Sequence, residues 1–339
     1  MFIKLLNSCK LTKAQQYIII SIIVFFGVFF WLSKLQLQSE LPNAIGDPLE
    51  LVVVRDSDAH TNRFYQTIKN LLNTDLGPSP QPESILSIIE IENNKFTGIL
   101  QRHHNILIIT KSDNFNIKFE NDVFAKNQTV IIISCNSEHE LISNEEKIRQ
   151  LHEEIKTVEI NRLITSIEKK NNNNLKNKIL ENHNVSMLVP NGFFLAHLEK
   201  GLTWIRRETN KLSQGVFLAN IPPEMEQLFF TQTSIAIDSM IRPHILGPIS
   251  GSYMITDKNA PVKKDTISIN GIEMIKQQSL WRMKNDFMGG IYVSYIFHGS
   301  SQVEPFIIYT YLYSPGEPKK TPLIQLDAIV RTLSFKSYN

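Results

Sequence analysis

The chain reads MGGIYVSYIFHGSSQVEPFIIYTYLY between residues 288 and 313, and this stretch indicates how the C-terminal part folds. It contains two apolar runs rich in aromatic and β-branched residues, 291–297 and 305–313, separated by Gly299, Ser300 and Ser301. Such runs on either side of a glycine-containing turn are typical of a β-hairpin. The paired glycines at the start of the stretch allow a tight turn or a close backbone approach.

Hydrophobic periodicity extends in both directions from this hairpin and predicts the other elements. Strands are predicted at 49–54, 85–91, 105–110, 128–135, 185–189, 203–208 and 215–219. Helices are predicted at about 60–73, 136–168, 193–200, 224–241 and 322–333. In each half a strand and a helix come first, several strands follow, and a helix closes the unit. We therefore expect an α+β fold made of two similar units with mixed or antiparallel sheets.

The N-terminal region contains an apolar segment, YIIISIIVFFGVFFWL, from Tyr17 to Leu32. As a helix this segment would be about 24 Å long, somewhat less than the roughly 30 Å of a bilayer's hydrocarbon core. Extension to residue 37, with Lys34 reaching toward the interface, makes up the difference. The sequence therefore predicts a transmembrane anchor at 17–37, in contact with the lipid bilayer.

The distribution of lysines around the segment predicts its orientation. Lys4, Lys10 and Lys13 precede it, and Lys34 alone follows closely. The positive-inside rule then places the N-terminus in the cytoplasm and the body outside, as a single-pass protein. A cleaved signal peptide is the alternative, because a basic start and an apolar core fit it equally well. Only Ala44 offers a small residue for cleavage, with Pro42 just before it, so the uncleaved anchor is favoured.

The predicted organisation has six parts. They are a cytoplasmic N-terminus at 1–16, the anchor at 17–37, a linker at 38–48, a first α+β half at 49–170, a polar connection at 171–184 and a second α+β half at 185–335.

Composition excludes several functional classes. The 339 residues are 42% hydrophobic and 20% charged, which is typical of a folded protein. The net charge is only +2 and the basic residues are scattered, so nucleic acid is not an expected partner. Cys9 and Cys135 would lie on opposite sides of the membrane, which excludes a fold built on disulfides. We find no metal-binding or cofactor-binding motif and expect neither group.

Several local strings carry a resemblance to a known family. They are Leu51–Leu72, Pro80-Gln81-Pro82-Glu83, His104-Asn105-Ile106-Leu107, Trp204–Thr209 and Trp281–Gly290. With these strings the chain resembles domain-of-unknown-function family 4837, envelope lipoproteins of Bacteroidetes-type bacteria. The resemblance covers nearly everything after the linker, implies a location in the bacterial cell envelope, and carries no activity. Members of the family typically have a lipid-accepting Cys after the hydrophobic core. This chain lacks that Cys, and an uncleaved helix would replace the lipid as the tether.

Two strings supply the candidate ligand-binding residues. They are Trp204, Arg206 and Glu208 in the first string, and Trp281, Arg282 and Asp286 in the second. In a strand the first three share one face, where an Arg fork beside a Trp ring could bind a carboxylate or phosphate. The ordinary alternatives are an internal Arg–Glu pair beside a packed Trp, and a turn in which Asp286 bonds nearby backbone.

The function that these observations favour is a non-enzymatic one. We expect a membrane-tethered periplasmic protein that serves as a binding or envelope-assembly module, with other envelope proteins as partners. The alternative is an uncharacterised envelope hydrolase with a cleft between the halves that uses Arg206, Glu208 and Asp286. Placement of the two Trp-Arg strings near each other in the same half is a further prediction.

Overall fold

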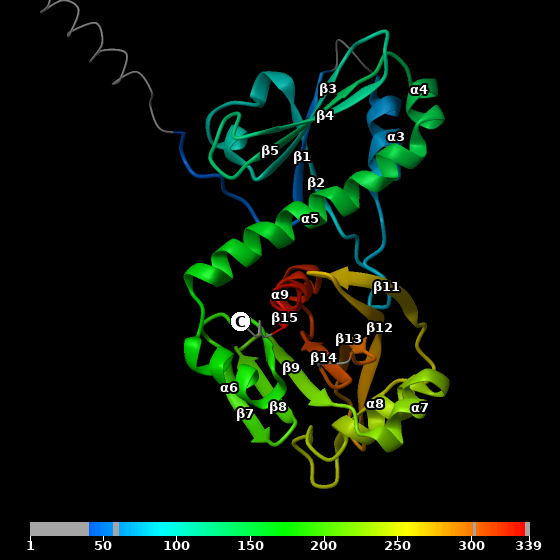
Figure 1. Cartoon of the computed structure of the whole chain (residues 1–339). Coiled ribbons are helices and arrows are strands. Elements are labelled where there is room, and N and C mark those ends of the chain that lie inside the picture. The colour runs from blue at the N-terminus through cyan, green and yellow to red at the C-terminus, as the bar shows by residue number, and fades with distance from the viewer. Residues whose placement is uncertain (1–40, 57–60, 301–302, 336–339) are drawn as a thin grey trace, which may run out of the picture.

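The structure is a computed structural model that describes residues 41–56, 61–300 and 303–335. Two domains lie one above the other, and the long helix α5 runs between them (Figure 1). The predicted anchor at 17–37 lies outside the described residues. Among the helices that are described, none has both the length and the apolar character needed to cross a bilayer.

The first domain contains a five-stranded mixed sheet in the order β2-β1-β3-β5-β4. The strands are β1 (Glu50–Arg55), β2 (Ser87–Glu92), β3 (Asn105–Thr110), β4 (Asn116–Asn121) and β5 (Thr129–Ser134). The first four in the order run parallel, and β4 pairs antiparallel with β5. The strands predicted at 49–54, 85–91, 105–110 and 128–135 are confirmed as β1, β2, β3 and β5. Strand β4 was not predicted, because its side chains are mostly polar and largely exposed.

Both faces of this sheet are covered. Leu51 and Val53 point into a core shared with helices α3 (Asn62–Leu72), α4 (Glu138–Ser143) and α5 (Glu145–Lys169). Val52 and Val54 point the other way, onto a smaller cluster that includes Phe96, the residue after the 3₁₀ turn η1 (Asn93–Lys95). A second 3₁₀ turn, η2 (Gly98–Arg102), follows it.

The helix predicted at 136–168 is two helices, α4 and α5, because the first one ends at Asn144.

The second domain contains an antiparallel sheet in the order β10-β12-β13-β14-β9-β8-β7, with β11 paired to β12. Its strands are β7 (Phe194–Glu199), β8 (Leu202–Glu208), β9 (Ser213–Asn220), β10 (Tyr253–Thr256), β11 (Lys263–Ile269), β12 (Ile272–Lys284), β13 (Gly289–Phe297) and β14 (Phe306–Tyr313). The predicted hairpin is confirmed as β13–β14, in which Ser294 pairs with Tyr309. A separate ribbon joins β6 (Val185–Ser186) to β15 (Ser334–Phe335).

Helices cover both faces of the second sheet. Helix α9 (Lys320–Arg331) packs on one face, and α7 (Pro223–Thr231) and α8 (Thr233–Ile241) pack on the other. The predicted helix at 224–241 is therefore two helices. The stretch predicted as a polar connection forms helix α6 (Asn173–His183), which begins where the Asn172 side chain accepts a hydrogen bond from the Leu175 amide.

The prediction of a helix at 193–200 is wrong, because this stretch is strand β7. Its Leu, Ala and Glu residues favour a helix, but Gly201 has φ +74° and turns the chain back so that β7 pairs with β8. Pairing with the sheet outweighs the local preference. The expected similarity of the halves is also wrong, since one sheet is largely parallel and the other is antiparallel.

The two domains share one hydrophobic core. Helix α5 of the first domain packs against α9 of the second, and buried residues from both domains belong to the same cluster. In Figure 1, α9 lies between α5 and the second sheet. This contact positions the residues that surround the candidate site.

Candidate functional site

A pocket of about 340 Å³ lies between the two domains. It is bounded by helix α5, helix α9, strands β11 to β14 and the connection after α3. Its apolar lining is Leu49, Leu76, Ile85, Ile267, Val293, Leu323 and Ile324. Its charged lining is Glu153, Lys156, Lys263, Asp265, Lys276, Lys320, Asp327 and Arg331. Pockets of this size are typical sites for small molecules, and here charged side chains line the pocket beside the apolar ones.

A buried ionic network forms one wall of the pocket. Asp327 of α9 accepts from Nζ of Lys276 at 2.9 Å, from Nε of Arg331 at 3.2 Å and from the hydroxyl of Tyr295 at 2.5 Å. Nζ of Lys276 also lies 5.3 Å from the centre of the Tyr295 ring. Each group of the network is thus held in one orientation by at least one other, so the wall is pre-organised.

Burial and neighbouring charges shift the pKa values of these groups. Burial raises the pKa of Asp327, but Lys276 and Arg331 outweigh it and hold that pKa well below its usual range. Burial lowers the pKa of Lys276 despite the Asp327 carboxylate. The pKa of Tyr295 is raised well above its usual value by burial and by Asp327. The network therefore contains a carboxylate that stays ionised and a lysine whose charge is costly to keep.

The rest of the charged lining is biased toward positive charge. Five cationic side chains and three carboxylates face the pocket. Of the carboxylates, Asp327 is neutralised by two cations, and Glu153 lies 3.3 Å from Lys156. Lys320 has its pKa lowered by burial, against the opposing effect of Glu83. An anion in the pocket would relieve this excess of positive charge.

The connection between α3 and β2 fixes the first domain to the second beside the pocket. The carboxylate of Glu83 accepts from the backbone amides of Lys319 and Lys320, at 2.8 and 3.2 Å, and so caps the start of α9. Nε2 of Gln278 donates to the carbonyls of Leu76 and Pro78, at 3.2 and 3.3 Å. The proline-rich string noted in the sequence is thus an interdomain contact.

The first predicted string lies on strand β8. Trp204 is buried, whereas Arg206 and Glu208 are partly exposed and form an ion pair with each other. Arg206 also lies over the Trp204 ring, with its guanidinium carbon 5.1 Å from the ring centre. Ser213 donates to Glu208 at 2.9 Å. This arrangement matches the ordinary alternative, an Arg–Glu pair beside a packed Trp.

The second predicted string lies at the end of strand β12. Trp281 is 2% exposed and donates its indole N–H to the Leu312 carbonyl at 3.2 Å. Arg282 is exposed, and Asp286 lies in the turn before β13, where it accepts from the amide of Phe287 at 2.6 Å. Gly290 is required here, because a Cβ atom at this position would lie 2.0 Å from the Leu312 oxygen.

The two strings lie in the same domain, as predicted, but on strands that are not neighbours, and Tyr311 of β14 lies between them. Its ring centre is 6.0 Å from that of Trp281, and its pKa is raised to about 12 by burial, with Arg206 acting in the opposite direction. Three strands separate β8 from β12, about 19 Å along the sheet. None of the six predicted site residues lines the interdomain pocket.

Sequence reasoning missed the pocket residues. One signal was present, because Asp327 lies among the apolar residues of the closing helix, where a carboxylate requires a buried partner. The partner Lys276 lies on β12, within a stretch for which no strand was predicted. Lys276 becomes the partner of Asp327 only because the sheet packs under α9, and no local sequence pattern predicts that packing.

Comparison with known proteins identifies two domains of unknown function. Residues 172–332 match the family model DUF4837, and residues 44–168 match DUF8532. The resemblance expected over nearly the whole body is therefore confirmed for the second domain, and the first domain matches a different model. No curated protein matches the chain.

One solved structure that is similar is the Saccharomyces cerevisiae Ran-binding protein Mog1p. It is 10% identical, and the match covers 45% of this chain and 90% of that one with a TM-score of 0.29, too low to indicate a shared fold. By family models, the second domain of the chain therefore matches the domain-of-unknown-function family DUF4837, and it follows a first domain that matches DUF8532.

Proposed function

We propose that this protein is a membrane-tethered extracytoplasmic binding protein whose interdomain pocket takes an amphipathic organic anion. The pocket itself carries the proposal, because an apolar floor and an excess of cationic side chains lie together between two domains. An anion with an apolar body would satisfy both parts of the lining. A neutral apolar compound would leave the net positive charge of the lining uncompensated, and an inorganic anion would leave the apolar lining uncovered.

The binding site would act through fixed charges. Lys276 is held by Asp327 and Tyr295, while Lys156 and Lys263 lie nearer to solvent. An arriving carboxylate, sulfonate or phosphate would meet the solvent-facing lysines first. Its charge would then add to that of Asp327 in favouring the protonated form of Lys276.

Residues 17–37 are the proposed tether, with the N-terminus in the cytoplasm of a bacterial cell and the two domains in the periplasm. Support comes from the apolar segment and from the lysines that precede it. Other envelope proteins remain proposed partners. Fusion of alkaline phosphatase to the C-terminus tests this placement, with an active fusion expected. An inactive fusion, together with a fluorescent cytoplasmic reporter at the same position, would contradict it.

A matched pair of ligands tests the pocket. Naphthalene-2-sulfonate and naphthalene-2-methanol have the same apolar body and differ in charge. In calorimetric titrations of the full chain, we expect the sulfonate to bind at least about tenfold more tightly. The double variant Lys156→Gln/Lys263→Gln should remove this preference, whereas Lys95→Gln, an exposed change in the first domain, should keep it. Equal binding of the two compounds by the natural chain would refute the proposal.

A further inference from the structure

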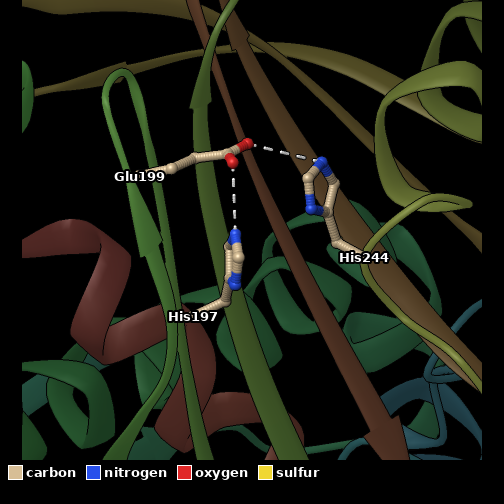
Figure 2. Close-up of side chains that lie close together, drawn as sticks. All are labelled: His197, Glu199 and His244. Carbon is tan, nitrogen blue, oxygen red and sulfur yellow. Dashed lines mark ion pairs between the residues drawn. The ribbon is translucent and has the colours of Figure 1, made fainter.

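Three side chains of the second domain meet outside the interdomain pocket. They are His197 and Glu199 on strand β7 and His244 in the turn after helix α8. Figure 2 shows the Glu199 carboxylate between the two imidazole rings, each of which directs a nitrogen toward it. None of the three lines the interdomain pocket.

The distances fit a small divalent cation. Nε2 of His197 lies 3.4 Å from Oε2 of Glu199, and Nε2 of His244 lies 3.7 Å from Oε1 of the same carboxylate. One ligand atom from each residue can be chosen so that all three lie within 4.8 Å of one another. Ligands at about 2.0–2.1 Å from a tetrahedral zinc ion are about 3.4 Å apart, so each imidazole nitrogen already lies near this spacing from one oxygen of the Glu199 carboxylate.

Local folding explains why the three residues converge. The register of β7 shifts between Leu195 and His197, and beyond this bulge His197 and Glu199 alternate with Leu198 and share a face. His244 comes from the other side, in a turn where its amide donates to the Ile241 carbonyl at 3.1 Å. Its ring lies 5.8 Å from that of Phe217, which limits its orientations.

The environment of the His197 ring also suits metal binding. Nε2 of His197 is buried and faces the Glu199 carboxylate at 3.4 Å without forming a hydrogen bond to it or to any other group in the described part of the chain, so this atom is placed for a ligand bond. Neutral imidazole and ionised carboxylate are the forms that coordinate zinc.

We infer that His197, Glu199 and His244 form a binding site for a divalent transition-metal ion of the zinc class. Two imidazoles and one carboxylate leave a fourth position, which water or a group from another molecule would fill. Protein zinc sites with three protein ligands and one open position are the ones that polarise a bound water or substrate. Carboxylate and imidazole donors without thiolate also fit Zn²⁺ better than a soft ion such as Cu(I).

Direct metal titration of the full chain, purified without a histidine tag and treated with a chelator, tests this site. Calorimetry with ZnCl₂ and visible absorption with CoCl₂ are the two measurements. We expect one equivalent of Zn²⁺ per chain and a Co²⁺ spectrum of tetrahedral type. His244→Asn and Glu199→Gln should each weaken Zn²⁺ binding by at least about tenfold. His139→Asn, which removes an exposed histidine of α4, should bind as the natural chain does.

Two outcomes would overturn the inference. One is a natural chain that binds no Zn²⁺, and the other is a Glu199→Gln variant that binds Zn²⁺ as tightly as the natural chain. Glu199→Gln keeps the shape of a partly exposed side chain and so keeps the test valid even if His244→Asn fails to fold. Thermal unfolding of each variant in the presence of the chelator identifies such a failure.

Discussion

Nζ of Lys276 lies 2.9 Å from Oδ1 of Asp327, and this contact joins the second sheet to helix α9 at the wall of the interdomain pocket. Asp327 also binds Arg331 and Tyr295, so one buried carboxylate orients three other groups. A buried ion pair contributes little net stability when it is complete, but the loss of one partner is costly. The pair therefore makes the pocket sensitive to single substitutions.

Asp327→Asn should lower the free energy of unfolding by about 3 kcal/mol, because it removes a buried carboxylate and leaves the partly buried Lys276 and Arg331 without it. Urea unfolding of the full chain measures the loss. Asp113→Asn, which changes an exposed carboxylate in the first domain, should stay within about 0.5 kcal/mol of the natural chain. Equal stability of the Asp327 variant and the natural chain would show that the network is not needed for folding.

Trp281→Ala should cost about 3–5 kcal/mol, since the indole is almost completely buried and donates to the Leu312 carbonyl. Arg282→Ala, at the next position on the exposed face of β12, should cost less than about 0.5 kcal/mol. Melting temperatures of the two variants test the contrast. Unchanged melting of Trp281→Ala would contradict its placement in the core.

Glu83→Gln should loosen the contact between the domains, because Glu83 is the anionic cap of α9 and comes from the opposite domain. Loss of a charged cap at a helix N-terminus costs about 1 kcal/mol. Faster hydrogen exchange at the start of α9 and around residues 76–85 is the expected signature. Exchange that stays the same in both segments would mean that the cap does not hold the domains together.

Stability should fall as the pH falls through about 6.5, because burial lowers the pKa of His183. Its ring contacts Asn220 at 2.8 Å and Thr203 at 2.9 Å. Below the usual histidine pKa the unfolded chain binds a proton that the folded chain takes up only at lower pH, so acid favours unfolding.

His183→Asn should reduce this dependence, measured as the difference in unfolding free energy between pH 7.5 and pH 5.5. Burial also lowers the pKa values of His244 and His298, so some dependence should remain in the variant. A variant with the full slope of the natural chain would show that His183 does not titrate as described.

Local patterns predicted much of the fold. The β13–β14 hairpin, the parallel strands β1, β3 and β5, and helix α9 have periodicities that match their burial. Strand β7 was mistaken for a helix because its residues favour one and its pairing with β8 is a tertiary effect. The polar run at 171–184 predicts a connection, whereas in the structure Asn172 caps helix α6.

The candidate site was not predictable in the same way. Gln278 and Leu76 make their interdomain contact across 202 positions of sequence, and Lys276 and Asp327 are 51 positions apart. The Trp204 and Trp281 strings stand out in the sequence because large side chains and glycines pack tightly there. Their prominence reflects the core of the sheet, whereas the pocket is made by residues that are individually ordinary.

The most direct test of the proposed function is the position of a bound anion. A crystal structure of the full chain with naphthalene-2-sulfonate should show the naphthalene ring over Leu49, Ile85 and Ile324, with the sulfonate facing Lys156 and Lys263. Density for the ligand at any other place, or an empty interdomain pocket at a saturating concentration, would contradict the account.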